Sequence, residues 1–379
     1  MAKIGMIGTG FVADHYMRSL KTYPELDLVA AYDSSPERLN QFATHWKVPA
    51  ASSLSALIEA IGPGGIILNL TNPSSHYEIS RTCLDAGLHV YSEKPLAMRL
   101  EDAQALHDLA AERGLMIASA PCTFLGESAQ TVGAAIRAGV LGKPRLIYAE
   151  LDDDFIAKAP YQHWTSTTGK PWPAQDEFTV GCTLEHAGYY LTWLIALFGS
   201  IRTVVAASAC LAPDAMGVEQ PAPDFSVATL FFESGLVARL TCSVLAPHDH
   251  SLRIIGDHGV LELKDCWDNS SAVRFRRRFI VRRRLINAPI ARRLRLAQNT
   301  HPKVDRWGAV ALNYALGPKE MVDALAEGRP CRASADLALH LTEVTLAIQA
   351  SGANAGAQTM RTRCAPIAPM PWATRLSGH

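Results

Sequence analysis

The first third of the chain alternates short apolar runs with stretches of helical periodicity. Five runs have the length and composition of buried strands, at residues 3–7, 26–33, 64–72, 88–95 and 115–121. Amphipathic segments lie between them, most clearly at 11–20, 76–87 and 99–114. Strict alternation of strand and helix predicts a parallel, doubly wound sheet with helices on its faces.

The pattern changes beyond Pro121, where we place the hinge. A helix is expected at 128–144 and a strand at 145–151, and strands between 201 and 284 predict a large, mostly antiparallel open sheet. We therefore expect two domains, over residues 1–121 and 122–365, the second of α+β type. The Pro-rich tail, 366–379, is expected to be loosely ordered.

Composition restricts the class of protein. The 379 residues are 48% hydrophobic, with 36 basic and 36 acidic side chains, so no global field favours nucleic acid or a membrane as partner. The eight cysteines form no CxxC pair, which favours reduced thiols. We expect a cytoplasmic protein with neither a signal peptide nor a membrane span.

The turn after the first run carries a glycine motif. Gly8, Gly10 and Ala13 fit the pattern G-x-G-x-x-[GA] between a strand and a helix. Such a turn lets backbone N–H groups and the helix dipole face a pyrophosphate, which predicts a Rossmann-type nucleotide site. The turn residues expected to contact the cofactor are Gly8, Thr9, Gly10, Phe11 and Val12.

Asp33 bears on the choice of cofactor. It ends the second strand, 25 residues after Gly8, where a ribose-binding acid is expected. A carboxylate repels a 2′-phosphate, so NAD is favoured over NADP, although Ser34, Ser35 and Arg38 leave the alternative open.

Polar residues follow the later strands. Because ligands collect at the carboxyl ends of parallel strands, these residues are expected to face one crevice. They are Thr71, Asn72, His76, Glu93, Lys94 and Pro95.

Several segments together resemble the Gfo/Idh/MocA oxidoreductase family. The resemblance is carried by "GTGFVA", by "TNPSSHYEISRTCLDAGLHVYSEKPLA", by "DFSVATLFFESGLVARLTCS" with "IIGDHGVLELKD", and by the closing helices from residue 319. It implies a Rossmann domain followed by an open-sheet domain that binds substrate and mediates homodimers or homotetramers. The family's catalytic lysine falls on Lys94, and a cis bond before Pro95 is expected.

The resemblance also assigns residues in "LEHAGYYLTW". The family commonly carries D-x-G-x-H in a helix of the second domain. Registered on Gly188, His186 stands where Asp is usual and Tyr190 where His is usual. Tyr190 is then expected to pair with Lys94 as acid/base, with His186 orienting the substrate or relaying a proton. A slip of one residue would put Glu185 and Tyr189 there instead.

The remaining candidates lie in the second domain. His163, Trp164 and Trp172 are candidates to line a sugar pocket, with loop packing as the alternative. "HDH" at 248–250 shows no third ligand at useful spacing, so no metal site is expected. Residues 274–295 hold ten arginines and no acid. They predict a solvated face or mobile loop, or else a site for a phosphate-bearing sugar, an acidic polymer or a protein.

These observations predict an NAD-dependent oxidoreductase acting on a hydroxyl carbon of a sugar, cyclitol or sugar derivative. Two alternatives remain open. One is a glycoside hydrolase that uses bound NAD in a redox-neutral cycle, and the other is a non-catalytic NAD-binding sensor.

Overall fold

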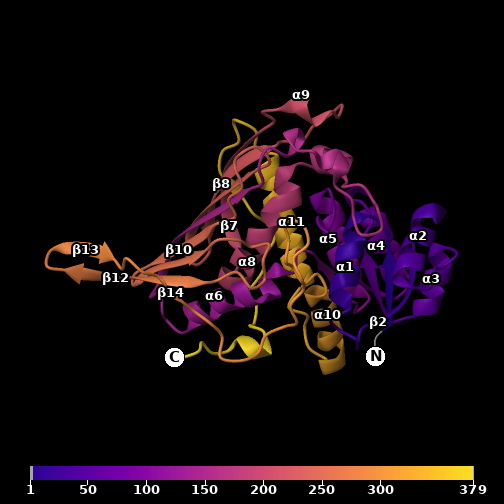
Figure 1. The fold of residues 1–379 in the computed structure, drawn as a ribbon, viewed down its shortest axis with the longest axis horizontal. Coiled ribbons are helices and arrows are strands. Elements are labelled where there is room, and N and C mark those ends of the chain that lie inside the picture. The colour runs from indigo at the N-terminus through magenta and orange to yellow at the C-terminus, as the bar shows by residue number, and fades with distance from the viewer. Residues whose placement is uncertain (1–2, 379) are drawn as a thin grey trace.

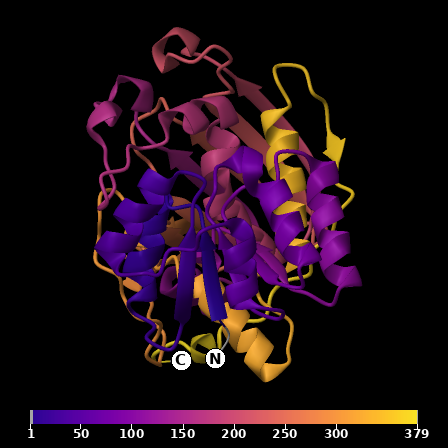
Figure 2. The ribbon, with the colours of Figure 1, turned by 90° about the vertical axis from the view of Figure 1, so that its right-hand side faces the viewer.

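The computed structural model describes residues 3–378. The first domain is a five-stranded parallel sheet in the order β2-β1-β3-β4-β5. Its strands are β1 (Lys3–Ile7), β2 (Asp27–Tyr32), β3 (Ile66–Asn69), β4 (His89–Ser92) and β5 (Ile117–Ser119). Its helices are α1 (Phe11–Leu20), α2 (Pro36–Trp46), α3 (Leu54–Ile61), α4 (His76–Asp85) and α5 (Leu100–Glu112). They flank the sheet (Figure 2), and the predicted doubly wound sheet is confirmed.

The second domain is built on a ten-stranded sheet in the order β13-β12-β11-β10-β6-β9-β8-β7-β15, with β14 paired to β12. Only β6 and β9 run parallel; the other neighbours are antiparallel. The strands are β6 (Pro144–Asp152), β7 (Ile201–Ala209), β8 (Phe225–Phe232), β9 (Val237–Ser243), β10 (Leu252–Gly256), β11 (Gly259–Leu263), β12 (Arg274–Val281), β13 (Arg284–Asn287), β14 (Arg292–Arg293) and β15 (Gln358–Thr359). The mostly antiparallel open sheet is therefore also confirmed.

The remaining helices belong to the second domain, and the last of them joins it to the first. They are α6 (Glu127–Arg137), α7 (Ala174–Val180), a π-helical turn at Thr183–Ala187, α8 (Gly188–Phe198), α9 (Pro213–Met216), α10 (Leu316–Glu327) and α11 (Ala335–Gln349). Helix α11 contacts α5 of the first domain as well as α8 and β7 of the second (Figure 1). Buried Trp193 of α8 lies in this shared core.

One expectation about a surface segment is corrected. The tail is packed rather than loosely ordered, because Met370, Ala373 and Leu376 are buried and the Met370 N–H donates to Gln130 Oε1 at 3.0 Å. The Arg-rich segment contains the hairpin β12–β13, which is largely exposed and projects from the body (Figure 1), as expected for a solvated face. Among residues 3–378, no helix is both long and apolar enough to cross a membrane.

Candidate active site

A cleft of about 1620 Å³ runs from the glycine turn of the first domain to the sheet of the second. Both domains supply its walls. From the first come the carboxyl ends of β1, β2, β3 and β4, the edge where ligands bind in such sheets. From the second come the loop around residues 153–177 and the helical segment that contains Glu185 and Tyr189.

The glycine turn forms an open cradle. Gly8 has φ +92°, and a Cβ there would lie 2.5 Å from the Leu70 carbonyl oxygen, so only glycine fits. A Cβ on Gly10 would meet nothing within 4 Å, which leaves room for a ligand. No side chain caps the start of α1, so its first N–H groups can bind an anion. Gly10, Phe11 and Val12 line the cleft beside them.

Asp33 is held firmly at the end of β2. Its carboxylate accepts from the Thr9 N–H at 2.8 Å, the Thr9 hydroxyl at 2.9 Å, the Ser35 N–H at 2.8 Å and Arg38 Nη2 at 2.6 Å. Burial alone would raise the pKa of Asp33, but these donors outweigh it and lower the pKa. Asp33, Ser34 and Arg38 line the cleft, whereas Thr9 is buried beneath Asp33 and supports it.

The residues that follow β3 and β4 divide into two groups. Thr71, Asn72, Glu93 and Lys94 line the cleft. His76 does not: it is buried, with Nδ1 2.6 Å from the Pro95 carbonyl oxygen and Nε2 3.0 Å from that of Thr71. His76 thus ties the two loops together rather than facing a cofactor. The expected cis bond between Lys94 and Pro95 is present.

Lys94 brings an ammonium group into the cleft. Its ammonium forms an ion pair with Glu185, and both side chains are largely buried. Burial lowers the pKa of Lys94, while nearby carboxylates oppose that shift. The geometry therefore holds a partly desolvated ammonium against a carboxylate at the junction of the domains.

The expected pairing of Lys94 with Tyr190 is not formed. Tyr190 is fully buried and its hydroxyl donates to the His250 carbonyl oxygen. Tyr189 lines the cleft with Lys94 instead, and Glu185 stands one turn before it. The pair that meets Lys94 is therefore the one expected from a slip of one residue, Glu185 and Tyr189.

His186 does line the cleft, but its ring is already engaged. Nδ1 lies 2.6 Å from Asp153 Oδ2, and Nε2 contacts Glu177. Burial alone would lower the pKa of His186, but these two carboxylates raise it to about 10. With both nitrogens occupied, His186 has none free to exchange a proton directly with a substrate.

The aromatic loop covers one side of the cleft. His163, Trp164 and Trp172 all line it, and the rings of Trp164 and Trp172 meet edge-on with centroids 5.3 Å apart. The Arg-rich segment is elsewhere, since none of residues 274–295 lines the cleft. The structure thus gives no support to the alternative that residues 274–295 bind a substrate phosphate in the cleft.

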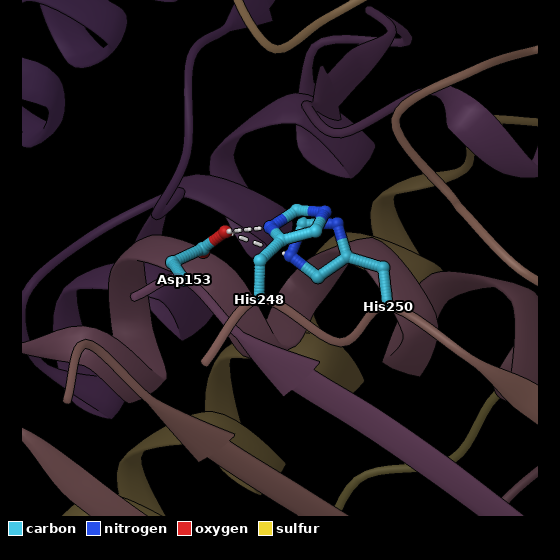
Figure 3. Close-up of side chains that lie close together, drawn as sticks. All are labelled: Asp153, His248 and His250. Atoms are coloured by element: carbon cyan, nitrogen blue, oxygen red, sulfur yellow. Dashed lines mark hydrogen bonds and ion pairs between the residues drawn. The ribbon is translucent and has the colours of Figure 1, made fainter. Parts of the chain in front are cut away.

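The expectation that His248 and His250 lack a third ligand is wrong. Asp153 supplies the missing third group: its carboxylate faces both His248 and His250, and one ligand atom from each residue lies within 4.8 Å of the others (Figure 3). Asp153 is the middle residue of the acidic run 152–154, the one sequence signal that could have suggested it. Sequence reasoning likewise missed Tyr314 and Trp267, which line the cleft and carry no motif.

Comparison with known proteins agrees with this geometry. Residues 2–120 match the model of an oxidoreductase family with an NAD-binding Rossmann fold, and residues 129–262 match the C-terminal domain of the same family. The chain belongs to the Gfo/Idh/MocA oxidoreductase family.

Individual relatives are distant. The chain is 25% identical over 285 residues to the uncharacterized oxidoreductase YfiI of Bacillus subtilis, covering 70% of each protein. It is 26% identical over 148 residues to the UDP-N-acetylglucosamine 3-dehydrogenase of Acidithiobacillus ferrooxidans, covering 39% of this chain and 44% of that enzyme. The solved structure of WlbA dehydrogenase from Bordetella pertussis, a complex with NADH and UDP-GlcNAcA, shares the fold. Its TM-score is 0.71 at 18% identity, over 95% of this chain and 99% of that one.

Proposed function

We propose that this protein is an NAD-dependent dehydrogenase that oxidises a CH–OH group of a sugar, cyclitol or sugar derivative. The observation that carries the proposal is that Lys94, Glu185 and Tyr189 meet in a cleft continuous with the glycine turn. The relatives named as dehydrogenases of sugar nucleotides support the substrate class.

The first domain fits a dinucleotide. The uncapped start of α1 and the open space at Gly10 would hold the pyrophosphate. Asp33 would face the ribose of the adenosine half, where its negative charge disfavours a 2′-phosphate. Bound NAD would accept a hydride from the carbon that carries the reacting hydroxyl.

Lys94 and Tyr189 would act on the hydroxyl itself. An ammonium beside the reacting oxygen stabilises the negative charge that develops as its proton leaves. Burial raises the pKa of Tyr189 well above its usual value, so the phenol holds its own proton and acts as a hydrogen-bond donor or as one step of a relay. Glu185 contacts Lys94 and would set the position of the ammonium. Its carboxylate would be the final acceptor of the hydroxyl proton, which Lys94 would pass on by giving one proton to Glu185 and taking one from the substrate.

The second domain would position the substrate. His186 is fixed between Asp153 and Glu177 and presents one edge of its ring to the cleft. Trp164 and Trp172 offer apolar surfaces of the kind that pack against sugar rings.

The test is NADH formation with a panel of sugars, cyclitols, sugar acids and nucleotide sugars, measured for wild type and for Lys94→Met. The proposal predicts turnover with at least one member of the panel, lost in Lys94→Met while NAD binding is kept. Glycoside cleavage without net NADH would contradict it in favour of a redox-neutral hydrolase. An unchanged rate in Lys94→Met would remove Lys94 from the chemistry.

A further inference from the structure

Three side chains from two distant parts of the chain converge at one end of the cleft. Asp153 follows β6, whereas His248 and His250 lie in the loop between β9 and β10. The backbone fixes this approach, because Asp152 and Asp249 exchange two hydrogen bonds, at 3.1 and 3.0 Å. The Asp153 N–H also donates to the Ser243 carbonyl oxygen at 3.0 Å. The convergence is therefore a property of the sheet and not of flexible side chains.

The donor atoms have the spacing of ligands to one ion. Asp153 Oδ1 is 2.7 Å from His250 Nε2 and 3.6 Å from His248 Nδ1 (Figure 3). Two ligands of a tetrahedral zinc ion, each about 2.0–2.1 Å from the metal, lie roughly 3.3 Å apart. The two observed distances bracket that value.

Burial divides the cluster into an anchored side and an open side. Asp153 and His250 are almost completely buried, with side-chain exposures of 4% and 0%. The side chain of His248 is 45% exposed, and it lines the cleft together with Asp153. An ion bound here would thus be held from within the protein and reachable from the cleft.

A second layer of contacts orients the histidines. The far nitrogen of His250, Nδ1, lies 3.5 Å from Asp265 Oδ1, and that carboxylate is itself fixed by the Trp267 N–H at 2.7 Å. Histidines that bind metals commonly present their other nitrogen to a carboxylate. The backbone N–H of His248 donates to Asp154 Oδ1 at 3.1 Å, which secures the loop.

The two buried members of the cluster each face a further group. Asp153 Oδ2 lies 2.6 Å from His186 Nδ1, so Oδ1 is the oxygen that faces both histidines of the cluster. His250 Nδ1 is buried and makes no hydrogen bond within residues 3–378, and Asp265 Oδ1 lies 3.5 Å from it. A metal ion on Nε2 of His250 would leave the N–H on Nδ1 facing Asp265, and it would place positive charge beside the buried Asp153 carboxylate.

We propose that Asp153, His248 and His250 bind a divalent transition metal ion of the zinc class. Two imidazoles and one carboxylate are a donor set that such ions take. Three protein ligands leave a coordination position open, and here that position faces the cleft. An oxygen of a molecule bound in the cleft, from a hydroxyl pair or a carboxylate, is the ligand it would accept.

The experiment measures metal binding alone, without NAD or sugar, so it is independent of the proposed dehydrogenase activity. Chelator-treated full-length protein is titrated with Zn²⁺ by calorimetry and with Co²⁺ by visible absorption. Wild type is compared with His248→Ala and with His258→Ala, a matched control at an exposed histidine outside the cluster. His248 is half-exposed, so its replacement should leave the fold intact, and circular dichroism checks this.

We expect one equivalent of Zn²⁺ to bind wild type and His258→Ala alike, and Co²⁺ to give ligand-field bands with both. His248→Ala should bind at least about 100-fold more weakly and lose the bands, because one of three ligands is gone. Asp265→Asn, which removes only the carboxylate behind His250, should weaken binding about 10-fold. The proposal is overturned if wild type binds no ion, or if His248→Ala binds as tightly as His258→Ala.

Discussion

Replacing each of two adjacent tyrosines with phenylalanine distinguishes a residue of the active site from a residue of the core. Tyr189 lines the cleft, whereas Tyr190 is buried and donates to the His250 carbonyl oxygen. Each substitution removes one hydroxyl group and keeps the ring, so packing changes little. We expect Tyr189→Phe to reduce activity and Tyr190→Phe to reduce stability.

The magnitudes follow from what each hydroxyl contacts. A positioned acid or base typically contributes about 10²- to 10⁴-fold to a rate. Tyr189→Phe should therefore raise the barrier by roughly 3–5 kcal/mol. Tyr190→Phe leaves a buried carbonyl oxygen without its donor, which costs about 1–3 kcal/mol in the free energy of unfolding. Its kcat/KM should stay within about 3-fold of wild type, because its hydroxyl does not reach the cleft.

The assay pairs steady-state kinetics on the best substrate with urea unfolding of the same preparations. The m-value should be unchanged in both variants if only the native state is affected. The opposite pattern, with activity lost in Tyr190→Phe and kept in Tyr189→Phe, would refute the assignment and restore the register counted from Gly188.

Three further predictions follow from the site. Asp33→Ala removes the negative charge expected beside the ribose and frees Arg38 from its ion pair. The ratio of kcat/KM with NADP to kcat/KM with NAD should therefore rise about 10-fold or more. An unchanged ratio would mean that Asp33 does not select the cofactor. Activity that needs the Lys94 ammonium should fall as pH rises through its pKa, which burial lowers from the usual ~10.4. Glu185→Gln removes an anion that favours the ammonium, so the high-pH limb of kcat/KM should move to lower pH. A limb that stays in place would contradict the pairing of Glu185 with Lys94. We also expect a homodimer or homotetramer formed through the second sheet. Val205→Glu, at an exposed position of β7, should shift the mass measured by light scattering toward the monomer, whereas Leu211→Glu in a loop should not. Equal masses for the two variants would argue for another interface.

Local signals predicted most of the first domain. Each strand is a short apolar run, each helix has its own apolar face, and the Gly8 turn is set by a steric requirement that only glycine meets. The position of Lys94 followed from the same logic, because a residue just after a parallel strand must face the ligand-binding edge.

The residues of the candidate site were harder to predict from the sequence, because they are brought together by segments that are distant along the chain. Tyr190 was chosen by its spacing from a single glycine, and that spacing cannot show that Glu185 and Tyr189, one residue earlier, are the pair that faces Lys94. His76 has the right strand-end position, yet its ring is used to join two loops.

Other features could not be predicted because they are contacts between segments that lie far apart in the sequence. Asp153 meets His248 and His250 only because β6 and β9 pair in parallel and the loop after β9 folds back on Asp152. The Pro-rich tail looked loosely ordered by composition, but Met370 and Leu376 find apolar partners that composition cannot reveal.

The most direct test of the central claim is the stoichiometry of a single reaction. Wild-type protein, the best substrate and excess NAD are run to completion, and NADH and the oxidised sugar are both quantified. The account predicts equal amounts of the two, with neither formed by Lys94→Met. Sugar transformed without matching NADH would contradict net oxidation in this cleft.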